Sequence, residues 1–162
     1  MLGNEILQSI QLVAFDFDGV FTDNSVWVNE DGVESVRCNR SDGFGLARLK
    51  SVEVQPVIIS SETNKVVSKR AEKLDILCKQ GVKNKEVALK EVCGDLGIPI
   101  GNTMFIGNDI NDIPALQAAG VPVAVADAYS EVLPYVVLTT KTPGGLGAVR
   151  EICDMIYNAK QA

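Results

Sequence analysis

The sequence predicts an α/β fold in which helices cover both faces of a doubly wound parallel sheet. Two observations support this prediction. Short apolar runs rich in β-formers alternate with stretches of helical periodicity along the 162 residues. Several of these runs are followed at once by polar side chains, which is typical of buried parallel strands that end at a ligand site. We expect a single domain over 1–162, because no linker, repeat or low-complexity segment interrupts the pattern.

Each expected strand is a short run of β-formers bounded by turn residues or charge. The first covers 10–17 and ends abruptly in charge, and the next, 55–59, has Pro56 near its start. Segments 25–28 and 33–37 flank an Asn-Glu-Asp-Gly turn and predict a β-hairpin. The remaining strands are expected at 76–78, 103–106, 121–125 and 136–139.

The expected helices lie between these strands and are marked by apolar spacing and by cap residues. The segment 85–96 is stopped by Gly97 and followed by Pro99, and 113–119 is capped by Gly120. The segment 148–159 is amphipathic and ends the pattern. Further helices are expected at 42–50, 63–73 and 129–135.

Composition and charge exclude several classes of function. The net charge of −6 makes the chain a poor partner for nucleic acid or for anionic membranes. The absence of histidine excludes a Ser-His-Asp triad, a histidine general base and histidine-containing zinc sites. The four cysteines form no CxxC motif, and no signal peptide or membrane-spanning run is visible, so we expect a cytoplasmic protein.

Two carboxylates, Asp16 and Asp18, stand at the end of the first expected strand. Like charges this close raise a pKa or recruit a cation. Mg²⁺ fits best, because it is typically held by one or two carboxylates together with a substrate phosphate. One alternative is a solvated strand end. An EF-hand calcium loop is excluded, because the twelfth position counted from Asp16 is Trp27 instead of Glu.

Further polar clusters follow later strands. Ser60 and Ser61 come after 55–59, and Asn108 and Asp109 come after 103–106. Because ligands bind beyond the carboxyl ends of parallel strands, we expect these side chains to converge, together with Lys85 at a helix start. Taken alone, a residue such as Ser60 is usually a helix cap, and one such as Lys85 usually lies on a solvated helix face. Together they indicate a site for a phosphate and a metal ion.

These residues, in this order, resemble the four motifs of the haloacid dehalogenase (HAD) superfamily of phosphohydrolases. The matching segments are Asp-Phe-Asp-Gly-Val-Phe-Thr-Asp at 16–23, Ser60, Lys85, and Gly-Asn-Asp-Ile-Asn-Asp at 107–112. More narrowly, the segments 40–43, 80–81, 123–128 and 144–151 resemble small phosphatases acting on 2-keto-3-deoxy sugar acids. These include 3-deoxy-manno-octulosonate 8-phosphate (KDO 8-phosphate) phosphatase and phosphatase domains associated with N-acylneuraminate cytidylyltransferases.

The resemblance implies a Mg²⁺-dependent phosphatase that works through an aspartyl phosphate. Asp16 would be the nucleophile and Asp18 the general acid and base, while Ser60 and Lys85 would hold the phosphoryl oxygens. Mg²⁺ would lie between Asp16, the backbone carbonyl of Asp18 and the fourth motif. Asn108 and Asp109 are the candidate ligands in that motif. The expected substrate contacts are Asp42, Ser61, Glu62, Arg70 and Asp112, with Arg70 facing the substrate carboxylate.

Two departures from the family pattern bear on activity and on substrate. Asn108 stands where the family usually has a metal-binding Asp, so the site loses one negative charge. Ser61 and Glu62 stand where KDO 8-phosphate phosphatases have Gly-Arg, and Ala47 replaces another Arg. An arginine would pair with the substrate carboxylate, whereas Glu62 would repel it. We therefore expect a sialic-acid-like nine-carbon 9-phosphate ahead of KDO 8-phosphate. The alternative for Glu62 is an acidic residue favoured at a helix start.

The spacing of the motifs leaves no room for the cap domain of larger relatives. The resemblance then implies a homotetramer in which hairpins of neighbouring subunits wall each site and the glycine-rich segment 144–147 lies near a neighbour's site. A cytidylyltransferase is a further candidate partner. Three other functions remain open. They are a phosphatase of another small metabolite, a receiver-like signalling domain, and a catalytically weak scaffold for a cytidylyltransferase.

Overall fold

A six-stranded parallel sheet forms the centre of the computed structural model, which describes residues 3–162. The strand order is β5-β4-β1-β6-β7-β8. The strands are β1 (Leu12–Phe15), β4 (Gln55–Ile59), β5 (Leu77–Lys79), β6 (Thr103–Gly107), β7 (Val121–Ala124) and β8 (Leu138–Thr139). The predicted α/β class and parallel sheet are confirmed.

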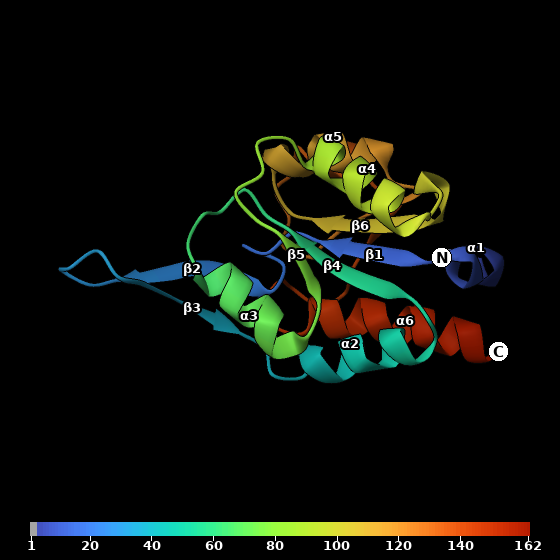
Figure 1. Ribbon diagram of the computed structural model, residues 1–162, viewed down its shortest axis with the longest axis horizontal. Coiled ribbons are helices and arrows are strands. Elements are labelled where there is room, and N and C mark those ends of the chain that lie inside the picture. The colour runs from blue at the N-terminus through green and yellow to red at the C-terminus, as the bar shows by residue number, and fades with distance from the viewer. Residues whose placement is uncertain (1–2) are drawn as a thin grey trace.

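Helices cover both faces of this sheet (Figure 1). One face carries α4 (Lys85–Leu96) and α5 (Ile113–Ala118), and the other carries α2 (Asp42–Ser51), α3 (Val66–Leu74) and α6 (Ala148–Gln161). Side chains alternate along the strands, so that Leu12 joins the apolar cluster under α4 and Val13 joins the one under α6. Because both faces are buried at the centre of the sheet, β1, β4 and β6 are largely continuous apolar runs.

The order of the strands places a crevice beside β1. The chain moves outward from β1 to β4 and β5, returns to β6 on the other side of β1, and moves outward again to β7 and β8. Phe15 pairs with Ile58 on one side and with Ile106 on the other. The residues that follow β1, β4 and β6 therefore emerge level with one another, at the point where ligands bind in such sheets.

A β-hairpin, β2 (Thr22–Val28) and β3 (Glu34–Cys38), begins a few residues after Asp18 and projects from the body of the molecule (Figure 1). The expected hairpin is confirmed, with a shift of register between Thr22 and Val26. Only this hairpin, α2 and β4 separate Asp18 from Ser60, and only α3 and β5 separate Ser60 from Lys85. Within residues 3–162 no inserted domain covers the crevice.

The prediction of a helix over 129–135 is wrong. Only a short 3₁₀ turn, Leu133–Tyr135, forms there. The amides of Val132 and Leu133 donate to carbonyls three residues back, and Pro134 has no N–H with which to continue a helix.

Two other helices also differ from expectation. The short α1 (Asn4–Ser9), which packs on α6, was not predicted. Helix α3 begins at Val66 instead of 63, because Asn64 Oδ1 accepts the Val66 amide and holds the preceding residues in a turn. No helix in the described range 3–162 has the length and apolar character needed to cross a bilayer.

Candidate active site

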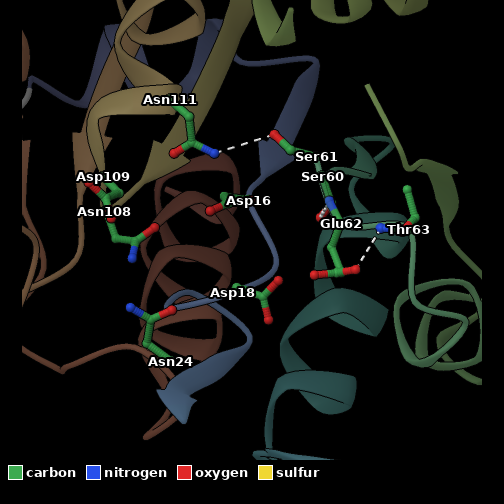
Figure 2. A pocket seen from close by; sticks show the side chains of 10 residues that line it. All are labelled: Asp16, Asp18, Asn24, Ser60, Ser61, Glu62, Thr63, Asn108, Asp109 and Asn111. Atoms are coloured by element: carbon green, nitrogen blue, oxygen red, sulfur yellow. Dashed lines mark hydrogen bonds between the residues drawn. The ribbon is translucent and has the colours of Figure 1, made fainter. Parts of the chain in front are cut away.

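A cavity of ≈ 300 Å³ opens at the carboxyl edge of β1, β4 and β6. Figure 2 shows its lining side chains, which come from the ends of these three strands and from the start of the hairpin. They are Asp16, Asp18, Asn24, Ser60, Ser61, Glu62, Thr63, Asn108, Asp109 and Asn111. The predicted convergence of the strand-end clusters is therefore observed. The wall contains four carboxylates and no lysine or arginine.

A buried ion-pair network lies at the floor of the cavity. Lys85 Nζ donates to Asp16 Oδ1 at 2.6 Å and to Asp112 Oδ1 at 2.7 Å. All three residues are at most 4% exposed. Lys85 is the first residue of α4, where Asn84 caps the helix by accepting the Val87 amide. Because buried charges are stable only when paired, the two carboxylates and the ammonium hold one another in place.

The charges on this floor do not balance, and the pKa values show it. Burial, followed by repulsion from Asp112, raises the pKa of Asp16 to about 7, although Lys85 opposes the shift. Burial alone would lower the pKa of Lys85, but its pairing with Asp16 and Asp112 outweighs burial and raises that pKa. One ammonium faces two carboxylates, so the floor carries excess negative charge that a further cation would neutralise.

Asp112, an expected substrate contact, does not line the cavity. The side chain is fully buried. Asp112 Oδ2 accepts the amides of Asn108 and Asp109 at 2.8 and 3.2 Å, while Oδ1 accepts from Lys85. A Cβ at Gly107 would lie 2.6 Å from this carboxylate, which explains the glycine there. Asp112 therefore couples the loop after β6 to Lys85.

The Asp16 carboxylate is one of three oxygen-bearing groups that meet at one point of the cavity. The Asn108 side-chain amide lies 3.0 Å from Asp16 Oδ2 and 3.0 Å from the Asp18 carbonyl oxygen. With its nitrogen toward them, the amide donates to both. With its oxygen toward them, one carboxylate, one carbonyl and one amide oxygen converge, which suits a hard cation. Within residues 3–162, no cluster of three or more Asp, Glu, Cys or His side chains could by itself hold a metal ion. This donor set fits Mg²⁺, which takes its remaining ligands from water and substrate phosphate.

Asp18 stands above this floor, half-buried at the start of the turn that leads to the hairpin. Burial raises the pKa of its carboxyl group, repulsion from Glu62 adds to the shift, and Lys85 opposes it. A carboxyl group with a raised pKa keeps its proton closer to neutral pH, as a general acid requires.

Comparison with known proteins then decides the family. Residues 50–150 match the model of the haloacid dehalogenase-like hydrolase family. The chain belongs to this family.

The relatives of this hydrolase include sugar-acid phosphatases. The 3-deoxy-D-manno-octulosonate 8-phosphate phosphatase of Escherichia coli K12 is 33% identical over 154 residues, which cover 94% of this chain and 82% of the relative. The crystal structure of the Yersinia pestis phosphatase of the same name has a TM-score of 0.93 at 34% identity, covering 98% of this chain and 86% of that one. The Moraxella catarrhalis phosphatase, solved with magnesium, phosphate and KDO, has a TM-score of 0.93 at 31% identity, covering 98% and 91%. The hydrolase therefore falls within the KDO 8-phosphate phosphatase-like group.

The rim of the hydrolase cavity is formed by the loop after β4. Ser60 Oγ accepts the Glu62 amide at 3.1 Å, and Ser61 Oγ accepts Asn111 Nδ2 across the cavity at 3.3 Å (Figure 2). Glu62 Oε1 accepts the amides of Thr63 and Asn64, at 2.7 and 2.8 Å. The Glu62 carboxylate is thus held in the wall by its own loop, and this loop shapes the entrance.

Asp42 and Arg70 lie outside the cavity of the described chain. Asp42, an expected substrate contact, is fully buried, and its Oδ1 accepts the Arg150 amide at the start of α6. Its Oδ2 has no partner. Burial raises the pKa of Asp42 to about 6, against the opposing hydrogen bond from Arg150. Arg70 donates to the Asn39 carbonyl at 2.9 Å instead of facing the cavity.

Three cavity residues were not expected: Asn24, Thr63 and Asn111. Asn24 adopts a left-handed conformation with φ of 64° in the part of β2 where the register shifts. Its only signal in the sequence is the run Asp23-Asn24-Ser25, which is poor in strand formers and so favours a bulge. Asn111 belongs to the fourth motif, but nothing in the motif predicts that its side chain lines the cavity.

Proposed function

We propose that this hydrolase is a Mg²⁺-dependent phosphatase of a phosphorylated 2-keto-3-deoxy sugar acid. The main support is the buried Asp16–Lys85–Asp112 network beneath the cavity. Beside it, the Asn108 amide lies next to both the Asp16 carboxylate and the Asp18 carbonyl. The named activity of the relatives, and the magnesium, phosphate and KDO in the Moraxella structure, support this ion and this substrate class.

Asp16 is the nucleophile in this proposal. One of its carboxylate oxygens is held by Lys85, and the other faces Asn108. Attack on phosphorus forms an aspartyl phosphate as the bond from phosphorus to the sugar oxygen breaks. Asp18 gives its proton to that leaving oxygen and then takes a proton from the water that hydrolyses the aspartyl phosphate.

Three groups would bind the phosphoryl oxygens. The Ser60 hydroxyl accepts the Glu62 amide, which leaves its own proton free to donate. Lys85 has three donors and uses two on Asp16 and Asp112, so the third remains for a phosphoryl oxygen. Mg²⁺, held by Asp16, the Asp18 carbonyl and Asn108 with support from Asp109, would neutralise charge on the transferring group.

The preferred substrate in this proposal is a sialic-acid-like nonulosonate 9-phosphate, ahead of KDO 8-phosphate. The described cavity wall offers no lysine or arginine to a substrate carboxylate, and Glu62 repels one. A nine-carbon chain carries its carboxylate farther from the phosphate, and so farther from Glu62, than an eight-carbon chain does. Hydroxyl and amide groups suit the neutral side chains of Asn24, Thr63 and Asn111.

We further propose that the protein is a cytoplasmic homotetramer in which hairpins of neighbouring subunits complete each entrance. On the projecting hairpin, Val26, Trp27, Val28 and Val33 are 49–60% exposed, as expected for a surface that another copy covers. All four cysteines are free, which supports a reducing compartment. Sedimentation measures the assembly, and a fully active species at the 17.4 kDa of one chain would contradict it.

Phosphate release tests the activity. The panel is KDO 8-phosphate, 2-keto-3-deoxynononate 9-phosphate and N-acetylneuraminate 9-phosphate, with Mg²⁺ and with Asp16→Asn as control. We expect the nine-carbon substrates to be preferred and the variant to lose about 10⁴-fold or more in kcat. A preference for KDO 8-phosphate would keep the mechanism and overturn the substrate assignment.

A second function is favoured by Asn108 alone, because an amide ligand leaves the metal site with one charge fewer. The protein would then be a weakly active partner that scaffolds a cytidylyltransferase. Negligible release from the whole panel, together with co-purification of a cytidylyltransferase, would support this second function and exclude the first.

A further inference from the structure

The loop 143–147, which joins β8 to α6, has no part in the chemistry described so far. It lies directly against the turn 19–23, which follows Asp18 and starts the hairpin. Gly145 N donates to the Val20 carbonyl at 3.0 Å. A Cβ at Gly144 would collide with the Gly19 carbonyl oxygen, and a Cβ at Gly145 with the Asp23 amide. The two backbones touch at positions where no side chain fits.

Asn108 holds the opposite side of the same turn. Gly19 has a φ of +85°, and a Cβ there would collide with the Asn108 amide group. Thr22 Oγ1 closes the turn by accepting the amides of Gly19 and Asn24, each at 3.1 Å. The turn is therefore enclosed between the loop after β6 and the loop 143–147.

Two acidic side chains from other segments hold the loop 143–147 and the residues just before it. Asp127, just beyond β7, accepts the Gly144 amide on Oδ1 at 2.8 Å. Glu151 in α6 accepts the amides of Lys141 and Thr142, at 2.8 and 2.9 Å, immediately before the loop. Neither acid lines the cavity. A displacement of this loop passes directly to the turn, because no flexible side chain lies between them.

We propose that Gly144 and Gly145 are positioning residues. Through them, the loop 143–147 determines where the turn 19–23 holds Asp18 and in which direction the hairpin leaves the site. Its effect on catalysis rests on the proposed function of Asp18. Displacing a catalytic group by about 1 Å costs on the order of 100-fold in rate.

The substitution Gly144→Ala tests this role, with Gly94→Ala in α4 as the matched control, since a Cβ at Gly94 meets nothing within 4 Å. Trp27 is the only tryptophan and lies in β2, so its fluorescence reports the hairpin directly. For Gly144→Ala we expect kcat to fall about 100-fold with little change in KM, a higher Mg²⁺ requirement, and altered Trp27 emission. Gly94→Ala should match the wild type in all three. A folded Gly144→Ala protein with wild-type kcat and emission would overturn the proposal.

If Gly144→Ala does not fold, substitutions at Asp127 test the same positioning role. Asp127→Ala removes the acceptor of the Gly144 amide, whereas Asp127→Asn keeps it. We expect the alanine variant to lower kcat about tenfold and to shift Trp27 emission, and the asparagine variant to restore both. Equal values in the two variants and the wild type would overturn the proposal. If the wild-type protein releases no phosphate from any substrate, the proposed function fails, and Trp27 emission still tests the positioning role.

Discussion

The floor and the rim of the cavity are built in opposite ways. The floor consists of buried charges, Asp16, Lys85 and Asp112, that hold one another at strand ends and at a helix start. The rim consists of the start of the hairpin and the loop after β4, whose cavity-lining side chains are neutral or acidic and, apart from Ser60, reach solvent. In the proposed mechanism, buried ion pairs hold the reacting groups, whereas exposed segments recognise the substrate.

Two ion pairs of α4 show how much burial matters. Lys85 Nζ lies 2.6 Å from Asp16 and Lys90 Nζ lies 2.6 Å from Glu86, so their lengths are equal. The first pair is almost completely buried, and the second is exposed. Exposed helical pairs contribute about 0.3–0.5 kcal/mol to stability. Removing one partner of a buried pair costs about 3–5 kcal/mol, because it leaves an unpaired buried charge.

The largest effect is therefore expected at Lys85. Lys85→Met should lower the free energy of unfolding by about 3–5 kcal/mol and abolish phosphate release, because two buried carboxylates lose their partner. Lys90→Met on the same helix should cost less than about 0.5 kcal/mol. Urea denaturation at neutral pH measures both. Equal costs for the two substitutions would show that the floor is not held by its buried ion pairs.

Substitution at Glu62 tests the rim. Glu62→Gln keeps an Oε1 acceptor for the Thr63 and Asn64 amides and removes only the charge. We expect kcat/KM for KDO 8-phosphate to rise about tenfold relative to a nonulosonate 9-phosphate, because repulsion of the substrate carboxylate is lost. Phosphate-release kinetics on both substrates measure this ratio. An unchanged ratio would mean that Glu62 serves only its own loop.

Asn108 stands where floor and rim meet. Asn108→Asp adds a charge and cannot donate to Asp16 or to the Asp18 carbonyl, so oxygens alone would converge there. We expect Mg²⁺ to bind about tenfold more tightly and to raise the melting temperature more than in the wild type. Calorimetric titration and thermal unfolding with and without Mg²⁺ measure both effects. Weaker binding by the aspartate variant would remove Asn108 from the ligand set.

At Asp42, a buried acid away from the cavity, the expected effect is on stability and depends on pH. Its folded pKa is about 6, whereas an unfolded Asp has a pKa of about 3.9. The folded state therefore holds the proton more tightly, and the stability it contributes, complete below about pH 4, is lost as the pH rises through 6. Asp42→Asn should stabilise the protein by about 3 kcal/mol at pH 7.5 and by nothing at pH 4. Urea unfolding at both pH values measures this, and an equal effect at the two would contradict it.

Much of the molecule could be predicted from the sequence, because the relevant signals are local. Apolar runs that end in charge indicate buried parallel strands, and Asp16, Ser60 and Asn108 were placed at one edge from their positions after such runs. The hairpin was predicted from a turn sequence between two short strands. The helix at 129–135 failed for an equally local reason, the proline at 134.

Other features depend on which segments meet in space, and only the tertiary structure decided them. Asp is a residue type that is mostly exposed, yet Asp42 and Asp112 are both buried. Asp42 meets the start of α6, and Asp112 meets Lys85. The need for glycine at 144 arises from a backbone more than a hundred residues earlier in the chain. A sequence pattern records periodicity and turns over a few residues. Burial, charge pairing and close backbone contact are properties of residues brought together from distant parts of the chain, so the fold must be known before they can be read.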